Sequence, residues 1–258
     1  MPEDGGVVVR QDQTRPDAAD AGALPSVPYV RKVIRLPPLP RQAKLAQVFI
    51  GDEKSPFPWT PPKARKRSRA EARALAERVA SEAHSGGDFA ALAKRYSEWP
   101  LASNNGGALG IVTQGFSGQL PIFPDSVFAL KPGEVSEAYQ SEVGFHVFKS
   151  LPVMHLAHIL IRVADGKGSS PPRTQSEART LAGAIAADLK AGKPFTDEAF
   201  EFSDDLSSAG RGGDLGVIDD RGGGLSPAQR MVIANLKVGE VSAPLETPAG
   251  IEILERVE

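Results

Sequence analysis

The stretch Leu130-Lys-Pro-Gly-Glu-Val-Ser136 returns later in the chain as Leu236-Lys-Val-Gly-Glu-Val-Ser242. Each residue of the second copy stands 106 positions after its counterpart in the first. The same offset relates two glycine-rich stretches, 106–110 and 212–216. A constant offset over so long a span indicates tandem copies of one structural unit. Residues 41–153 are called repeat 1 and residues 154–258 repeat 2.

Both repeats predict the same series of elements. An apolar, β-branched first strand is expected at 43–50 and at 155–163. The capping boxes Ser68-Arg-Ala-Glu71 and Thr174-Gln-Ser-Glu177 then mark helix starts, because their hydroxyl and carboxylate groups accept from unpaired N–H groups. A second helix, a strand, a third helix and two closing strands follow. The order β-α-α-β-α-β-β predicts an α+β fold, in which helices pack on a small antiparallel sheet in each of two tandem domains.

Residues 1–40 form a tail of a different kind. Leu36-Pro-Pro-Leu-Pro40 favours an extended backbone, since proline fixes φ and restricts the residue before it. A semi-rigid linker and a disordered terminus without a role both remain open. Met1-Pro-Glu-Asp-Gly-Gly has neither the basic nor the apolar region of a signal peptide. A cytoplasmic location is expected if Met1 is the true start, and an extracytoplasmic one if a leader is missing.

Composition excludes several classes of function. The 258 residues are 41% hydrophobic and 24% charged, as in ordinary globular proteins. The net charge of −2 argues against a nucleic-acid partner, and the absence of cysteine excludes disulfides and thiol nucleophiles. No apolar run reaches the roughly 18 residues of a membrane span. Neither a cofactor nor a metal is expected, because His155 and His158 would point to opposite faces of a strand. The oligomeric state is left open.

Several stretches, in this order and twice, resemble the parvulin family of peptidyl-prolyl cis–trans isomerases. The resemblance covers about residues 41–258. The stretches that carry it are Ala157-His-Ile-Leu-Ile161, Phe195 through Ser203, Gly-Gly-Asp-Leu-Gly at 212–216, residues 130–136 and Gly144-Phe-His146. It implies two facing histidines on adjacent strands, a Cys or Asp beside them, and a proline pocket of Leu, Met or Leu, and Phe.

Each repeat carries only part of this set. In repeat 1 the implied histidine positions hold Gln47 and His146, the Cys/Asp position holds Trp99, and the pocket positions hold Leu109, Leu120 and Phe123. In repeat 2 the corresponding residues are His158 and Glu252, then Asp205, with Leu215 and Leu225 in the pocket and Gln229 where Phe is expected. We expect a hydrogen bond within each facing pair, because an unpaired buried polar group costs ~1–3 kcal/mol. Purely structural roles for His146 and His158 remain open.

For the implied reaction, rotation about an X–Pro bond, we expect the apolar pocket to matter more than the histidines. The X–Pro bond resists rotation because resonance flattens the amide, with a barrier of ~18–20 kcal/mol. A twisted amide loses that charge separation, so an apolar pocket should favour it over the planar form. Repeat 1, with Phe123, is therefore predicted to bind proline better. His158 and Asp205 support the opposite assignment, especially if Met231 fills the gap left by Gln229.

The expected partner is a proline-containing, unfolded or flexible polypeptide. Because both sets are incomplete, a non-catalytic chaperone or peptide-binding module is the alternative. The basic run Lys63-Ala-Arg-Lys-Arg-Ser-Arg69 precedes a helix, where the helix dipole disfavours cations unless an anion is bound. It suggests a preference for acidic or phosphorylated residues before proline, and an ordinary solvated loop is the other interpretation.

Overall fold

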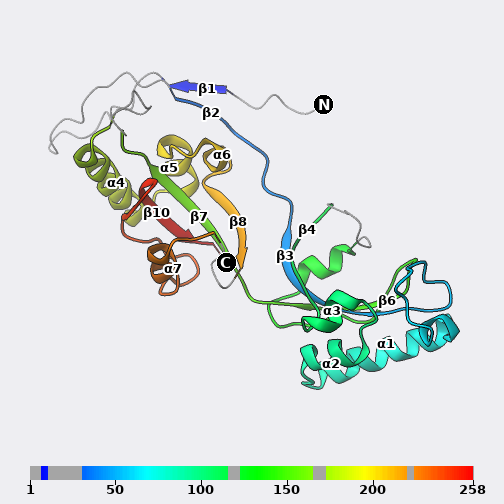
Figure 1. The fold of residues 1–258 in the computed structure, drawn as a ribbon. Coiled ribbons are helices and arrows are strands. Elements are labelled where there is room, and N and C mark those ends of the chain that lie inside the picture. The colour runs from blue at the N-terminus through cyan, green and yellow to red at the C-terminus, as the bar shows by residue number, and fades with distance from the viewer. Residues whose placement is uncertain (1–6, 11–30, 116–122, 165–172, 220–223, 258) are drawn as a thin grey trace. The chain divides into compact units, whose positions relative to one another are not determined.

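The computed structural model describes residues 7–10, 31–115, 123–164, 173–219 and 224–257 (Figure 1). It contains two antiparallel four-stranded sheets, one in each repeat, and helices that pack on them. The α+β fold class is confirmed. The chain divides into two compact units, which are described separately below.

Repeat 1 folds around a sheet with the strand order β4-β3-β6-β5. Its first strand is central, so that both of its edges are paired. The elements are β3 (Gln42–Ile50), the 3-10 turn η1 (Ala64–Lys66), α1 (Arg69–His84), α2 (Phe89–Tyr96), α3 (Pro100–Asn104), β4 (Ala108–Thr113), the 3-10 turn η2 (Asp125–Ala129), β5 (Tyr139–Gln140) and β6 (Phe145–Ser150).

Repeat 2 reproduces this topology with the strand order β8-β7-β10-β9. Its elements are β7 (Val153–Ile161), α4 (Gln175–Lys190), α5 (Phe195–Phe202), α6 (Leu206–Ala209), β8 (Asp214–Asp219), α7 (Pro227–Ile233), β9 (Leu245–Thr247) and β10 (Gly250–Arg256). The sequence prediction missed the short helices α3 and α6. They lie between the second helix and the glycine-rich turn, and each is too short to show a helical period.

The N-terminal region contains a two-stranded antiparallel ribbon, β1 (Val7–Arg10) with β2 (Arg31–Ile34). No strand was predicted there, because the prolines dominated the pattern. The β-branched run Val7-Val-Val9 was the available signal. Residues 31–39 belong to the same compact unit as repeat 2, although they precede repeat 1 in the sequence.

The long helices begin where the capping boxes predict. The Ser68 hydroxyl accepts from the Glu71 N–H while the Glu71 carboxylate accepts from the Ser68 N–H, and Thr174 and Glu177 do the same. Glycines with positive φ follow both helices, at Gly86 and at Gly192 after a one-residue cap.

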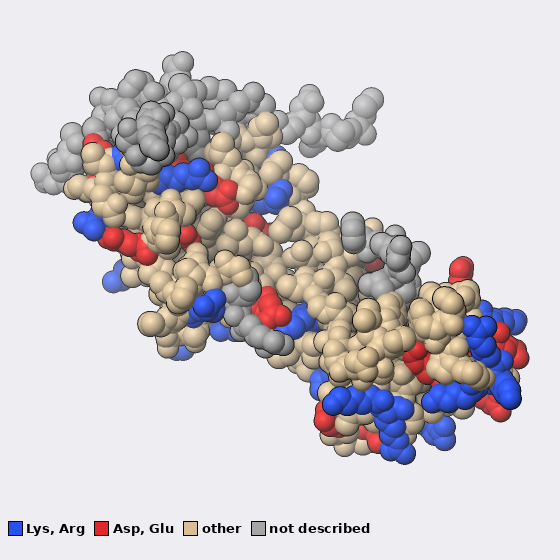
Figure 2. All heavy atoms as spheres, in the orientation of Figure 1, with Lys and Arg blue, Asp and Glu red and all other residues tan. Residues whose placement is uncertain are grey.

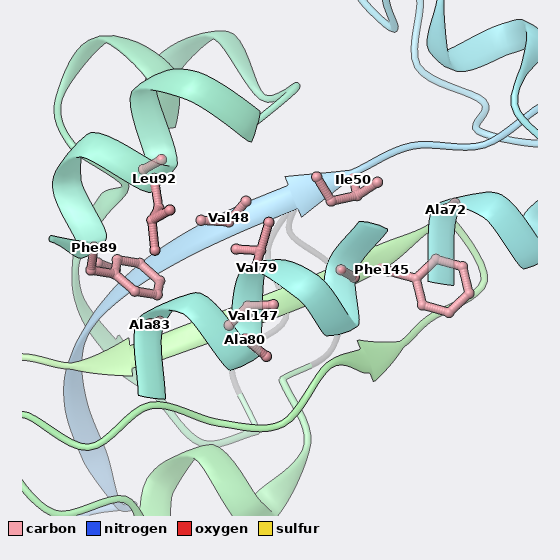
Figure 3. Close-up of a cluster of buried hydrophobic side chains, with 13 residues drawn as sticks. Val48, Ile50, Ala72, Val79, Ala80, Ala83, Phe89, Leu92, Phe145 and Val147 are labelled. Carbon is pink, nitrogen blue, oxygen red and sulfur yellow. The ribbon is translucent and has the colours of Figure 1, made fainter. Parts of the chain in front are cut away.

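The principal core of repeat 1 lies between α1, α2 and one face of the sheet (Figure 3). Val79 and Ala83 are buried as predicted, whereas Leu75 is only partly buried. Alanines form most of the buried face of α1, so that the helix backbone can approach β3 and β6 closely. A second apolar cluster, which includes Leu45 and Phe148, lies on the opposite face of the sheet.

Candidate functional site

The floor of the candidate site in repeat 1 lies on the neighbouring strands β3 and β6. Their register places Phe49 opposite His146 and Gln47 opposite Phe148. Side chains that are opposite, or two residues apart, share a face of the sheet, so these four point the same way. Gln47 and His146 are diagonal neighbours on this face, and both are fully buried.

His146 is held as a neutral imidazole. Its Nε2 lies 2.7 Å from the Ser141 Oγ, and its ring stacks on that of Phe148 with centroids 5.7 Å apart. Its Nδ1 has no hydrogen-bond partner among the described residues. Burial disfavours the charged form and lowers the pKa of His146 to about 3. The floor of repeat 1 therefore carries no charge on its histidine.

The hydrogen bond expected between Gln47 and His146 is not formed. Within the described part of the chain, neither amide atom of the Gln47 side chain has a hydrogen-bond partner. The expectation was wrong, because the His146 ring pairs with the Ser141 hydroxyl and not with the Gln47 amide. The backbone N–H of Gln47 is paired and donates to the Gly107 carbonyl over 2.8 Å.

Two of the three predicted pocket residues of repeat 1 lie together. Leu109 and Phe123 pack against the buried cluster that contains Phe148. The Phe123 and Phe148 rings meet edge to face with centroids 5.6 Å apart. Leu120 lies outside the described residues. The side chains of Leu109 and Phe123 therefore lie next to Phe148, on which the neutral His146 stacks.

Trp99 occupies the position where a Cys or Asp was implied. It is the N-cap residue of α3, and its ring lies 5.7 Å from that of Trp59. Trp59 in turn stacks on Phe57 and contacts Phe49. Where the family pattern has a polar group, repeat 1 therefore has an aromatic cluster.

Repeat 2 has an ionic floor. The His158 Nε2 lies 2.9 Å from the Asp205 Oδ2, and its Nδ1 lies 3.7 Å from the Glu252 Oε2. Asp205 is held in place as the N-cap of α6, where it accepts from the Ser207 N–H. The structure thus brings together all three residues that were singled out on this floor. His158 and Glu252 form an ion pair at 3.7 Å, which is longer than the hydrogen bond that was expected between them.

The two carboxylates keep His158 charged. Burial by itself lowers the pKa of His158, but the hydrogen bond to Asp205 and the negative charges of Asp205 and Glu252 raise it to about 9. The hydrogen bond to His158 in turn holds the pKa of Asp205 well below its usual range. Repeat 2 therefore presents an imidazolium between two carboxylates.

Gln229 adds a further polar group to this floor. Its amide Nε2 donates to the Glu252 Oε2 over 2.7 Å. Leu215 and Leu225 both pack against the buried cluster of Leu156, Ile233 and Leu254. Met231 does not replace the missing Phe, because its side chain faces solvent with 71% exposure.

Sequence reasoning missed one ion pair that both repeats share. In repeat 1 the guanidinium of Arg67 donates to both Glu98 oxygens, over 3.0 and 2.9 Å, and the Glu98 Oε2 also accepts from the Gly51 N–H. In repeat 2 Arg173 binds Asp204 in the same way. The offset of 106 relates both partners, so internal comparison of charged positions was the available signal.

Most arginines of the basic run before α1 form ion pairs or hydrogen bonds within repeat 1. Arg69 pairs with the buried Asp52 at 2.9 Å, and the Arg65 guanidinium donates to backbone carbonyls of the preceding loop. Arg67 is used in the pair just described. Lys and Arg side chains lie among Asp and Glu on the face shown in Figure 2. A preference for phosphorylated peptides stays a prediction, for which Lys63 and Lys66 remain candidates.

The described residues contain neither a metal-binding cluster nor a helix that could span a membrane. No group of three or more His, Cys, Asp or Glu in these segments could hold a metal ion. His155 is instead paired with Asp214 at 2.7 Å. No helix found in the same segments has the length and apolar character needed to cross a bilayer.

Comparison with known proteins agrees with this architecture. The Rotamase family, described as the PPIC-type PPIASE domain, matches residues 58–151 and 158–258. The chaperone SurA of Methylobacillus flagellatus is 35% identical over 199 residues, which cover 71% of this chain and 43% of the relative. The chaperone SurA of Escherichia coli O6:H1 is 34% identical over 206 residues, which cover 73% and 44%. The chain thus spans less than half the length of these relatives.

Solved structures give a weaker likeness. The peptidylprolyl isomerase PrsA from Bacillus anthracis is 28% identical, covers 41% of each chain and superposes with a TM-score of 0.33. PrsA from Bacillus subtilis is 31% identical over 41% of this chain, again with a TM-score of 0.33. Overall similarity at this level supports no conclusion by itself. The two family matches, which together cover most of the sequence, show that the chain belongs to the PPIC-type (rotamase) peptidyl-prolyl isomerase family and carries that domain twice.

Proposed function

We propose that the chain is a folding factor that catalyses cis–trans isomerisation of X–Pro bonds in unfolded or flexible polypeptides, and that repeat 1 is its better prolyl site. The observation that carries the proposal is the grouping of Leu109 and Phe123 beside Phe148, next to a neutral His146. Membership of the isomerase family supports the reaction class.

The proposed mechanism is preferential binding of the twisted amide. As the X–Pro bond rotates, the amide loses its charge-separated resonance form and its carbonyl becomes less polar. Apolar side chains around the prolyl ring then stabilise the twisted amide relative to the planar one, which has to give up more favourable hydration. Each 1.36 kcal/mol of this preference accelerates rotation tenfold. The reaction needs no nucleophile, and His146 acts as part of the floor.

The floor of repeat 2 suits this mechanism less well. The amide of Gln229 occupies the position of an apolar ring, and the charged His158 lies between two carboxylates. Such a floor favours polar or charge-separated groups, which are features of the planar ground state. Its tight internal pairing also leaves fewer groups to contact a substrate. We therefore assign repeat 2 the smaller share of the activity.

A non-catalytic chaperone is the second candidate. Trp99 stands in place of the implied Cys or Asp, so repeat 1 lacks a polar group that the family pattern places beside the prolyl bond. The relatives from Methylobacillus and Escherichia carry the name chaperone. In this case the candidate sites of both repeats would bind unfolded polypeptide without accelerating rotation about the X–Pro bond.

Exchange spectroscopy on Ala-Pro peptides tests both candidates. The whole chain should accelerate cis–trans exchange, and Phe123→Ala should reduce the acceleration by about tenfold or more, since that corresponds to 1.36 kcal/mol of lost preference. His158→Ala should retain most of it. Met231→Ala is the matched control, because Met231 is largely exposed.

Each contrary result is distinct. Loss of activity in His158→Ala alone would assign catalysis to repeat 2. Chemical-shift changes around Phe123 on peptide binding, without any acceleration, would select the chaperone. Tryptophan fluorescence shows whether each variant of repeat 1 is folded, because both tryptophans, Trp59 and Trp99, belong to that repeat.

A further inference from the structure

The segment Val33–Leu36 makes specific contacts with repeat 2, although it precedes repeat 1 in the chain. The Leu36 N–H donates to the Gly210 carbonyl over 2.8 Å. Val33 is only 6% exposed and pairs with Val8 of β1, so that it anchors the start of the segment in the ribbon. We call residues 33–36 the strap. It comprises the last two residues of β2 and the two residues that follow, and it lies at the corner formed by α5, α6 and the residue that follows α6 (Figure 1).

Gly210 shows that the corner is shaped for the strap. Its backbone has φ −61° and ψ −19°, an ordinary helical conformation that any residue adopts. Its local conformation therefore gives no reason for glycine. A Cβ at this position, however, would overlap the Ile34 carbonyl oxygen and lie 3.0 Å from the Leu36 Cγ. The three nearest atoms to such a Cβ all belong to the strap.

The strap also presents a charge that the corner complements. The guanidinium of Arg35 lies over the Phe200 ring, 4.3 Å from its centroid, and 3.9 Å from the Asp197 carboxylate. A cation over an aromatic face contributes about 0.5–1 kcal/mol at an exposed site. The exposed ion pair adds little energy, but it favours a basic strap over an acidic one.

Repeat 1 serves as an internal control, because it carries the same fold without these features. The offset of 106 maps Gly210 to Asn104, Phe200 to Lys94 and Asp197 to Ala91. Asn104 has a side chain where the strap needs none, and Lys94 would repel Arg35. The α5–α6 corner of repeat 2 therefore has three features that accept the strap, and the matching corner of repeat 1 lacks all three.

We propose that the α5–α6 corner of repeat 2 is a docking surface for the chain's own strap, Val33–Leu36. Docking ties the N-terminal region to repeat 2. The strap contacts the end of α6, the four-residue helix whose N-cap is Asp205. A docked strap thus also restrains the segment that carries the partner of His158, which makes the strap a positioning element for that pair.

The first test uses the unaltered full-length chain. The Leu36 amide should exchange its hydrogen at least tenfold more slowly than in a free peptide, because it is bonded to Gly210. Exchange at the free-peptide rate would overturn the proposal. Limited trypsin digestion supplies a second readout at the Arg35–Leu36 bond, which should be cut slowly while the strap is docked.

The second test removes the space that the strap needs. Gly210→Ala should abolish protection of the Leu36 amide, speed cleavage after Arg35 at least fivefold and shift the amide signals of residues 205–208. Gly183→Ala is the matched control, because nothing lies within 4 Å of a Cβ there. Unchanged protection and cleavage in Gly210→Ala would refute docking at this corner.

A third variant tests the proposal independently, in case Gly210→Ala does not fold. Phe200→Lys places the residue of repeat 1 on the half-buried surface of α5 and leaves the backbone unchanged. It should release the strap in the same way, with faster cleavage after Arg35 and faster exchange at Leu36. A folded Phe200→Lys chain with the strap still protected would show that the corner does not select it.

Discussion

At the scale of single residues, two histidines in equivalent sheets have opposite protonation behaviour. His146 is buried, contacts the Ser141 hydroxyl and has no charged partner among the described residues, so burial lowers its pKa to about 3. His158 is almost as buried but has Asp205 and Glu252 beside it, and its pKa is raised to about 9. Burial alone therefore does not set the charge of a floor histidine, because the nearest carboxylates decide it.

The two histidines should give opposite pH dependence of stability. Both titrate near 6.5 in the unfolded chain. As the pH falls from 6.5 towards 3, only the unfolded chain protonates His146, so repeat 1 loses stability in acid. His158 is protonated in the folded chain up to about pH 9, so its stabilisation of repeat 2 is complete below pH 6.5 and is lost as the pH rises through 9.

Nuclear magnetic resonance titration of the imidazole C–H signals checks both directions. Between pH 5 and 8 neither signal should pass through a midpoint, since His146 stays neutral and His158 stays charged. Asp205→Asn removes one carboxylate and should bring the midpoint of His158 down towards neutral pH. A midpoint near 6.5 for His146 in the folded chain would contradict its burial.

At the scale of elements, one ion pair fixes how the first strand of each repeat leads into its long helix. Arg67 binds Glu98 and the Gly51 carbonyl, while Glu98 also accepts from the Gly51 N–H. The pair therefore joins the end of β3, the residue before the capping box of α1, and the end of α2. Arg173 and Asp204 make the same connection in repeat 2.

Removal of Arg67 should be costly. Glu98 is only 5% exposed, so Arg67→Ala leaves a buried carboxylate without its partner and should lower the free energy of unfolding by about 3 to 5 kcal/mol. Urea denaturation followed by tryptophan fluorescence measures repeat 1 alone. Lys66→Ala, next to it in the same basic run but exposed, should change stability by less than about 0.5 kcal/mol. Equal losses in both variants would mean that the ion pair contributes nothing specific.

At the scale of the whole molecule, the two copies keep one fold and differ in the chemistry of their floors. The sheet order and capping boxes are the same in both. Repeat 1 has an aromatic pair, Phe123 and Phe148, at its predicted pocket together with a neutral histidine, and repeat 2 has an ionic floor to which Gln229 is bonded. Duplication allows such divergence, because one copy can retain a property that the other loses.

Conversion of the repeat 2 floor should transfer activity. In the Phe123→Ala background, the double substitution Gln229→Phe with Glu252→His supplies an aromatic side chain and removes one carboxylate. Isomerisation of an Ala-Pro peptide should then rise about tenfold over that background, equivalent to 1.36 kcal/mol. Met231→Phe in the same background is the control, because it adds an aromatic residue to the exposed side of α7. Equal gains from both changes would argue against a role for the pocket position.

The sequence by itself determined the repeat, the order of elements and the helix starts. These features are local, since a capping box such as Ser68–Glu71 or a glycine with positive φ such as Gly86 requires only neighbouring residues. The residues of the two candidate floors could also be named, because the order and spacing of the motifs resemble those of the parvulin family.

Only the tertiary structure decided which of those residues interact. Among the described residues it left the Gln47 side-chain amide without a hydrogen-bond partner, bound Gln229 to Glu252 and placed the strap against Gly210. The physical reason is that these contacts join residues far apart in sequence. Their distances depend on strand register and on the packing of whole helices, neither of which a local pattern encodes.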